Sequence, residues 1–310
     1  MYDETASFQI GNTTVFLYGL WIMLGAMALL LVFAWNAKKR ALPQGASALY
    51  GALALPLGLI CSRLLFCLLD FRFHDIFSLR AAAMFWGGGY SMIGALLGAA
   101  LAGWLTARIT KAQPLRVLDA LTPALLAFIL FARLGEGATE LLGRSRTLTW
   151  EALANSPLAY NDGYDGYLRT YLLEAATAAA LFCILQRALY REKKPGQVLF
   201  TGMLLLGCTQ ILWESLRFDS HMRYGFVSMQ MILFACMFAA PLILFAARCG
   251  KKAMIAAIAL VIFAAGGAVG LEFMIDRSDV NNIIVYLLYI VLLALPIAAG
   301  LYWKRRSERA

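Results

Sequence analysis

Long apolar stretches separated by short polar connections recur along the whole chain. Each holds roughly twenty residues, the length that an α-helix needs to cross the hydrocarbon core of a bilayer. The pattern predicts an all-α polytopic membrane protein with about nine transmembrane helices. The short strands of alternating polarity that a membrane β-barrel requires do not appear. The predicted spans are residues 14–35, 45–69, 90–107, 117–136, 167–187, 197–217, 227–247, 253–274 and 283–303.

Basic residues concentrate in alternate connections between these spans. By the positive-inside rule, this asymmetry places the N-terminus outside and the C-terminus in the cytoplasm. We therefore expect the formal net charge of +9 to serve contact with anionic lipid headgroups, and we expect no nucleic-acid partner. Of the 27 basic residues, 17 lie at 38–40, 108, 111, 116, 187, 191, 193, 194, 248, 251, 252, 304–306 and 309.

The cysteines and histidines show no pattern of metal ligation. The six cysteines lie in or at the edges of spans, without a Cys-x-x-Cys pair and without a neighbouring cluster of histidines. Such a distribution favours buried cysteines that act as small apolar residues. The sequence therefore predicts no metal site, no disulfide framework and no cofactor.

A dense group of charges and glycines closes the fourth span. The segment runs Arg133-Leu-Gly-Glu-Gly-Ala-Thr-Glu-Leu-Leu-Gly-Arg144. An ionisable side chain inside a membrane costs about 2.5–3.5 kcal/mol on insertion scales unless it is paired or hydrated. We therefore expect this segment to form a functional site that faces a polar cavity and binds something anionic.

Further intramembrane charges lie toward the same, predicted external, ends of the spans. Gln210, Glu214 and Arg217 have the spacing i, i+4, i+7, which predicts one shared helix face. The pattern favours a common cavity that opens outward. The alternative is that the charges form ion pairs that hold the bundle together, such as Glu214 with Arg217, although buried pairs often contribute little net stability. The charges on this side are Arg63, Arg133, Glu174, Glu214 and Arg217, and the exception is Asp119, near the predicted cytoplasmic end of the fourth span.

Three more segments have a distinct composition. The segment from Trp86 to Gly98, at the start of the third span, contains five glycines. These allow close helix packing or leave backbone N–H groups for an anion, and the sequence leaves both interpretations open. Residues 70–89 are too polar to span and predict an interfacial arm. Residues 137–166 predict a short external loop region, of which residues 145–166 are expected to be irregular.

Five ordered motifs resemble those of the bacterial phosphatidylglycerol–prolipoprotein diacylglyceryl transferase family. The resemblance covers roughly residues 14–245 and leaves the last two spans without a counterpart. The motifs are Phe16-Leu-Tyr18-Gly, Cys61-Ser-Arg63-Leu, Trp86-Gly-Gly-Gly-Tyr-Ser, the stretch from Asp119 through Arg133-Leu-Gly to Glu140-Leu-Leu-Gly143-Arg144, and Glu214-Ser-Leu-Arg217 with Gly225-Phe-Val-Ser-Met-Gln.

The resemblance implies a seven-helix transferase-like core over residues 1–248, which includes the arm at 70–89 and the loop region at 137–166. Residues 249–310 would form an additional two-helix membrane segment. The resemblance also implies an activity, the transfer of a diacylglyceryl group from phosphatidylglycerol to the lipobox cysteine thiol of a prolipoprotein signal peptide. That reaction takes place at the outer face of the bacterial cytoplasmic membrane, so the implied partners are these two substrates and the surrounding lipids.

The resemblance also implies roles for single residues. A guanidinium binds a phosphate through two parallel hydrogen bonds, and a thiol needs a base to form thiolate. Arg133 is accordingly the expected phosphate ligand. The expected catalytic residues are Arg133, Glu136, Glu140 and Glu214, and the expected substrate-binding residues are Arg133, Arg63, Arg217, Arg144, Tyr18 and Gly143.

The chain departs from the family pattern at four points. Ile93 occupies the place of the histidine regarded as the family's base, and Gln210 replaces a family arginine. Glu136 replaces an asparagine, and one residue is missing before Glu140. We therefore expect Glu136, Glu140 or Glu214 to serve as a substitute base. Two alternatives stay open, a non-catalytic paralogue that binds lipid or lipoprotein, and a membrane transporter.

Overall fold

The computed structural model describes residues 6–69, 82–85, 88–139, 144–147, 151–161, 166–192, 194–217, 223–225, 227–277 and 280–309. Within these ranges, nine helices are long and apolar enough to cross a membrane. The prediction of an all-α polytopic membrane protein is therefore confirmed. The described residues form two units, the first up to Leu199 together with Arg217, and the second from Phe200 to Leu216 and from residue 223 onward.

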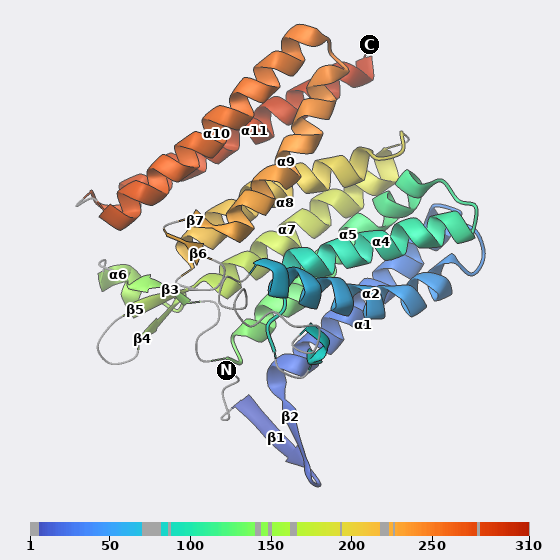
Figure 1. Ribbon diagram of the computed structural model, residues 1–310, viewed down its shortest axis with the longest axis horizontal. Helices are drawn as coiled ribbons and strands as arrows, with labels where there is room; N and C mark the ends of the chain where they lie inside the picture. Colours follow the sequence, from blue (N-terminus) through green and yellow to red (C-terminus); the bar gives the residue numbers. More distant parts are fainter. Residues whose placement is uncertain are drawn as a thin grey trace. The chain divides into compact units, whose positions relative to one another are not determined.

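Each predicted span corresponds to one of these helices (Figure 1). The boundaries follow local chemistry. The first helix begins at Leu17, after the predicted start, because Thr13–Phe16 pair in a strand, and the fourth begins with Pro114, which suits the first turn of a helix. The helices are α1 (Leu17–Lys39), α2 (Ala46–Leu69), α4 (Met92–Ile109), α5 (Pro114–Glu136), α7 (Thr170–Arg191), α8 (Gln197–Leu216), α9 (Met229–Ala247), α10 (Lys251–Arg277) and α11 (Asn282–Arg309).

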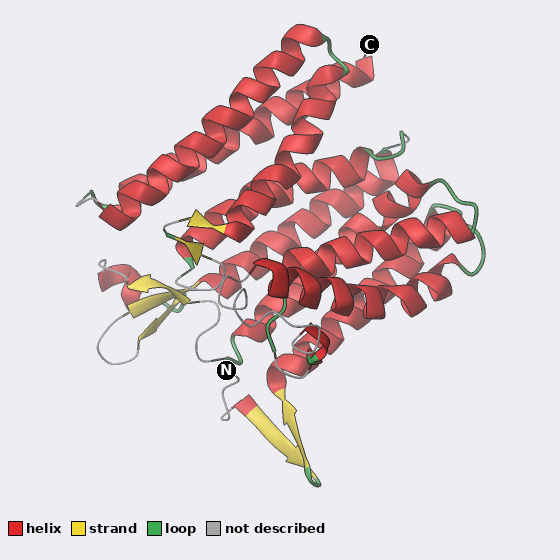
Figure 2. Cartoon of the chain, in the orientation of Figure 1, coloured by secondary structure: helices red, strands yellow, loops and turns green. Residues whose placement is uncertain are grey.

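Short strands precede α1 and lie in three of the connections between later elements (Figure 2). They correct the prediction that residues 145–166 are irregular, since the described part of this region contains strands and the short helix α6 (Glu151–Ala154). Strands of two to four residues are too short to show alternation in the sequence. The sheets are β1 (Ser7–Ile10) with β2 (Thr13–Phe16), β5 (Gly166–Arg169) between β3 (Arg144–Thr147) and β4 (Ala159–Asn161), and β6 (Arg223–Tyr224) with β7 (Val227–Ser228), all antiparallel.

In the first unit, α5 packs against α1, α4 and α7, and α2 packs against α4 (Figure 1). Phe33 and Tyr50 meet with ring centroids 4.3 Å apart inside this core. Gly94 and Gly98 bring α4 close to the backbone of α2, because a Cβ on either glycine would lie within 2.6 Å of a carbonyl oxygen. Close packing thus accounts for two of the glycines between Trp86 and Gly98.

We expect Gly98→Ala to destabilise the protein, because the new Cβ would lie 2.3 Å from the backbone oxygen of Leu57. The two helices would have to separate, at a cost of about 1–3 kcal/mol. Gly58→Ala on the same interface is the matched control, since its nearest neighbour, the oxygen of Ala95, lies 4.0 Å away. Thermal unfolding in detergent checks this pair, and equal melting temperatures would contradict the packing argument.

Asp119 lies fully buried in the second turn of α5 and contacts the start of α8. Its carboxylate accepts hydrogen bonds from the backbone N–H groups of Gly196 (2.7 Å) and Leu199 (2.8 Å). A helix has no internal acceptors for the N–H groups at its start, and this end favours a negative charge. Asp119 therefore caps α8 from another helix.

Replacing Asp119 with alanine should lower the free energy of unfolding by about 1–3 kcal/mol, because two backbone N–H groups lose their acceptor. An asparagine at this position keeps one acceptor oxygen and should lose less. Chemical or thermal unfolding of Asp119→Ala and Asp119→Asn in detergent measures the difference. An alanine variant as stable as the native protein would show that the cap contributes nothing.

In the second unit, α9, α10 and α11 pack against one another. Gly207 of α8 lets the backbone of Phe234 approach, and Gly267 of α10 contacts Leu292 of α11. The predicted division at residue 248 falls in the connection between α9 and α10 and stays a prediction. The predicted arm at 70–89 lies largely outside the described residues.

Candidate functional site

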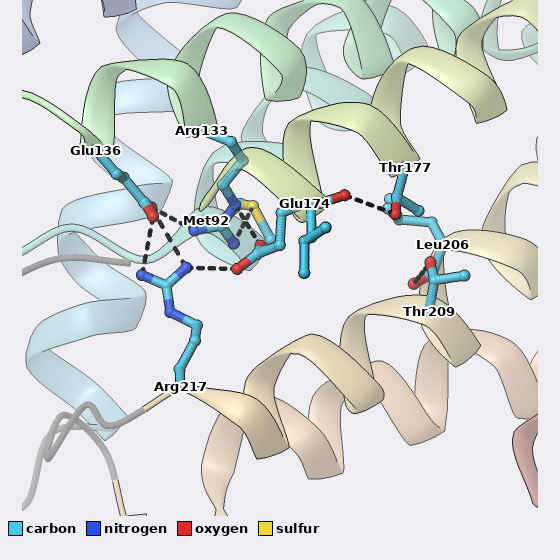
Figure 3. A network of polar contacts seen from close by, with 9 residues as sticks. Met92, Arg133, Glu136, Glu174, Thr177, Leu206, Thr209 and Arg217 are labelled. Atoms are coloured by element: carbon cyan, nitrogen blue, oxygen red, sulfur yellow. Dashed lines mark hydrogen bonds and ion pairs between the residues drawn. The ribbon is translucent and has the colours of Figure 1, made fainter. Parts of the chain in front are cut away.

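Four charged side chains from three parts of the first unit meet at one place (Figure 3). Arg133 and Glu136 lie in the last turn of α5, and Glu174 lies in the second turn of α7. Arg217 follows the last residue of α8, where its backbone forms an isolated β-bridge with Ser145. The end of α5, the start of α7 and the end of α8 thus converge on one cluster.

Within this cluster, the two guanidiniums share the two carboxylates. Arg133 pairs through Nη1 with Glu136 Oε1, and its Nε lies 2.7 Å from Glu174 Oε2. Arg217 Nη2 lies 3.1 Å from Glu136 Oε2, and its Nη1 lies 2.9 Å from Glu174 Oε1. The four side chains form a closed ring in which cations and anions alternate. We call Arg133, Glu136, Glu174 and Arg217 the arginine–glutamate ring.

The ring is buried, with no member more than 7% exposed and Glu174 fully covered. Two positive and two negative charges cancel, which makes burial of all four tolerable. Removing one partner from a buried pair leaves a charge without compensation and typically costs about 3–5 kcal/mol. The ring therefore holds two guanidinium forks close together within a site of low dielectric.

Glycines beside the ring allow aromatic side chains to approach. A Cβ on Gly135 would lie 2.6 Å from Cβ of Trp21 and 3.2 Å from the Tyr18 ring, and a Cβ on Gly137 would lie 2.8 Å from the Tyr171 ring. The Arg-Leu-Gly motif thus fixes α5 closely against α1. Tyr18, a predicted substrate-binding residue, packs one helix away from Arg133 and beside Gly135.

Arg63 of α2 is buried and is held by backbone carbonyl groups. Its Nη1 donates to the oxygens of Gly88 and Gly89, the latter at 3.0 Å. Both glycines have positive φ, which glycine adopts without strain. The Ser91 N–H donates to the Ser62 oxygen, and the Gly94 N–H donates to Ser91 Oγ. These carbonyl and N–H groups already have intramolecular partners, so this segment positions Arg63.

Glu214 and Gln210 are buried in the part of α8 that belongs to the second unit. Ser228 Oγ donates a hydrogen bond of 2.7 Å to Glu214 Oε1. Because α8 ends at Leu216, Arg217 lies just beyond the helix. The helix face that was predicted to carry Gln210, Glu214 and Arg217 therefore carries only the first two. The glutamate partners of Arg217 in the ring come from α5 and α7.

Several predicted site residues stay predictions. Glu140 and Gly143 lie outside the described residues, and of Arg144 only the backbone in β3 is described. Among the described residues, no group of three or more histidine, cysteine, aspartate or glutamate side chains is arranged to hold a metal ion.

The sequence by itself assigns no role in the site to Glu174 or Met92. Glu174 is recognisable in the sequence as an intramembrane charge, but its position gives no indication that it bridges both arginines. Met92 accepts a hydrogen bond of 3.2 Å from Arg133 Nη2 through its sulfur, and a methionine carries no sequence signal for such a contact. Met92 directly precedes Ile93, the residue that we expect in the place of a histidine, so this predicted position adjoins a residue in contact with Arg133.

Chemically, such a site is suited to a phosphate ester. Two guanidinium groups within one ring present several N–H donors to an anion, and forked binding of phosphate is among the stronger interactions of arginine. An incoming anion has to replace a carboxylate, because the ring is electrically neutral at rest. Binding of an external anion at this site would therefore require release of an internal carboxylate.

Comparison with known proteins identifies the family to which the chain is similar. The model of a family described as prolipoprotein diacylglyceryl transferase matches residues 5–247. Three similar proteins all carry the name phosphatidylglycerol–prolipoprotein diacylglyceryl transferase. They come from Clostridioides difficile (23% identical, over 71% of this chain and 85% of the relative), Thermotoga maritima (28%, over 69% and 75%) and Listeria innocua (25%, over 71% and 80%).

Proposed function

Because the chain belongs to the prolipoprotein diacylglyceryl transferase family, we propose that it transfers the diacylglyceryl group of phosphatidylglycerol to a cysteine thiol of a prolipoprotein. The observation that carries this proposal is the arginine–glutamate ring. It supplies two buried guanidiniums, one of them from Arg133 of the Arg-Leu-Gly segment, and both lie within the residues that the family model matches. The names of the relatives support both substrates.

We propose that Arg133 and Arg217 bind the phosphate of phosphatidylglycerol. As the thiolate sulfur attacks the glyceryl carbon, the bond from that carbon to the phosphate oxygen breaks, and glycerol phosphate leaves with the electron pair. The leaving group gains a negative charge in this step. Preorganised cations in a site of low dielectric stabilise such a developing charge more than water does.

Glu136 is the proposed base. It bonds to both arginines through both of its oxygens, so it occupies the place that a phosphate would take. When phosphate displaces it, the carboxylate loses its cationic partners and becomes a better acceptor for the thiol proton. Binding of the anionic lipid and deprotonation of the thiol are thereby coupled. Glu140 and Glu214 remain the alternative bases.

The other predicted residues complete the proposed lipid site. Tyr18 packs against the α5 end that carries Arg133, and Arg63 is fixed by the Gly88 and Gly89 carbonyl groups. We propose that these side chains, with Arg144 and Gly143, bind the rest of the lipid headgroup and the lipobox segment.

We propose that the site opens toward the outer face of a bacterial cytoplasmic membrane. The nine apolar helices in the described residues and the family of the chain both show that the protein is a multi-pass membrane protein. The basic clusters at the α1–α2, α4–α5, α7–α8 and α9–α10 connections and at the end of α11 support a cytoplasmic C-terminus. The ring lies at the opposite ends of α5, α7 and α8 from these clusters.

Expression in cells depleted of their own transferase tests the activity. The protein should restore the mass increase of a model prolipoprotein, and the purified protein should transfer a labelled diacylglyceryl group from phosphatidylglycerol to a lipobox peptide. A lipobox peptide with serine in place of cysteine is the control, because it lacks the nucleophile.

Absence of both rescue and transfer by correctly inserted protein would refute the proposal. In that case, retained binding of phosphatidylglycerol would indicate a paralogue that binds lipid without catalysis. Flux of a substrate into proteoliposomes without lipid modification would instead indicate transport.

A further inference from the structure

The second unit contains an apolar cavity of about 290 Å³ that is lined by residues of α8, β7, α9, α10 and α11. This volume is close to the lower end of the range for small-molecule sites, about 300–1,000 Å³. Most of its lining comes from α9 and α10, and the family match ends at residue 247, before α10 begins. The cavity thus depends on helices that the family match does not include.

Small side chains shape this cavity into a slot along the helices. On α10 the lining runs from Val261 to Glu272, a distance of about 16 Å at 1.5 Å per residue. Ala264, Ala265 and Ala268 supply the wall between these ends. The space is not a sign of loose packing throughout the unit, because Gly267, on the same stretch of α10, would carry a Cβ within 2.8 Å of Leu292.

The slot opens on a surface that faces lipid. Its lining includes Ile232 of α9, which is 48% exposed, and Val269 of α10, which is 44% exposed. Both lie in membrane-spanning helices. Apolar cavities of this kind are not filled by water. The hydrocarbon chains of the surrounding bilayer are apolar and adjoin the opening, so they are suited to fill the slot.

One polar side chain distinguishes the end of the slot. Glu272 lines it and is completely buried, and its electrostatic neighbours include Tyr289 of α11. A carboxyl group offers several lone pairs, so it can bond to a ligand in addition to its protein neighbours. A hydroxyl suits this carboxyl group in either protonation state, because it both donates and accepts hydrogen bonds. A phosphate is unsuitable, since two anions would be buried together.

We propose that this slot binds one hydrocarbon chain of a neutral lipid with a free hydroxyl, an acylglycerol, and that the hydroxyl lies at Glu272. The chain fills the alanine-lined space between α9 and α10 and enters from the bilayer through the opening beside Ile232 and Val269. The site is separate from the arginine–glutamate ring in ligand chemistry, since the ring binds an anionic headgroup.

Photolabelling in lipid nanodiscs tests the proposal. The probe is a diacylglycerol with a diazirine at the end of one chain, and the companion probe carries the same chains with the hydroxyl capped as a methyl ether. We expect the hydroxyl probe to label peptides of α9 and α10 that line the slot, about tenfold more than the ether probe. The measurement uses no prolipoprotein, so its outcome is independent of transferase activity.

Two variants localise the signal. Ala265→Phe fills the slot and should reduce labelling by about tenfold, whereas Ile262→Phe, at a side chain that is 67% exposed, should leave it unchanged. Equal labelling of both variants would overturn the site. Equal labelling by the ether probe, or by a matching phosphatidylglycerol probe, would overturn the recognition of a hydroxyl.

Discussion

Arg133→Ala is expected to lower kcat for diacylglyceryl transfer by about 10²–10³-fold, the effect of removing one charge-stabilising donor from an active site. The proposed phosphate ligands would be reduced to Arg217, and the developing charge on glycerol phosphate would lose half of its cationic partners. The measurement is transfer of labelled diacylglyceryl to a lipobox peptide at saturating phosphatidylglycerol. Comparable activity in the native protein and the variant would show that Arg133 does not stabilise the leaving group.

Arg133→Ala could also lose activity because the protein is destabilised, and this cause has to be separated from a loss of catalysis. Without Arg133, Arg217 alone would compensate Glu136 and Glu174, at an expected cost of about 3–5 kcal/mol of stability. The double variant Arg133→Met/Glu174→Gln restores neutrality and should regain most of that stability. If it also regained transfer, the role of Arg133 would be structural.

Arg133→Lys gives a finer comparison. Arg133 contacts Glu174 through Nε, Glu136 through Nη1 and Met92 through Nη2. A lysine ammonium is a point charge and cannot reach these three partners with fixed geometry. We expect the lysine variant to fold more stably than the alanine variant and to remain largely inactive.

Glu136→Gln is expected to lower kcat by about 10²–10⁴-fold, the usual contribution of a general base. The substitution preserves the shape of the side chain and removes its capacity to take the thiol proton. The ring would then carry one net positive charge, so the affinity for phosphatidylglycerol should be kept or increased. Separate measurement of lipid binding and of single-turnover transfer distinguishes the two effects.

Glu174→Gln is the matched control for this experiment. It removes the same charge from the same ring and leaves one carboxylate between the two arginines. Because Glu174 is the completely buried member, it is not expected to meet the thiol, and kcat should fall by less than about tenfold. Equal losses in the two variants would contradict the assignment of Glu136 as the base and would direct attention to Glu140 and Glu214.

The membrane-spanning helices were predictable because their burial in lipid requires long apolar stretches, and such stretches are visible in the sequence without knowledge of any contact. The short strands were missed for the opposite reason. Strands such as β4 and β5 form through pairing with residues elsewhere in the loop region. They are too short to show an alternation of polar and apolar residues in the sequence. The start of α1 was displaced because β2 competes for Thr13–Phe16.

The candidate site was partly predictable for a physical reason as well. Charges within a span are costly, so Arg133, Glu136, Glu174 and Arg217 stand out in the hydropathy pattern alone. The pairing of these four residues with one another is not visible in that pattern. Glu174 reaches Arg217 across 43 positions of sequence, and Glu136 reaches it across 81. The packing of α5 against α7 brings the two glutamates together, and Arg217 joins them from the residue after α8, where it forms a β-bridge with Ser145.

Hydropathy and motif order therefore specify a multi-pass membrane protein of this transferase family, since hydropathy reflects the solvent around each segment and motif order reflects local residue types. Which carboxylate holds which arginine depends on how the helices pack. The packing turns a set of separate charges into a neutral ring and assigns Asp119 to the cap of α8. It also opens a slot beside Glu272 in helices that resemble ordinary apolar spans in the sequence.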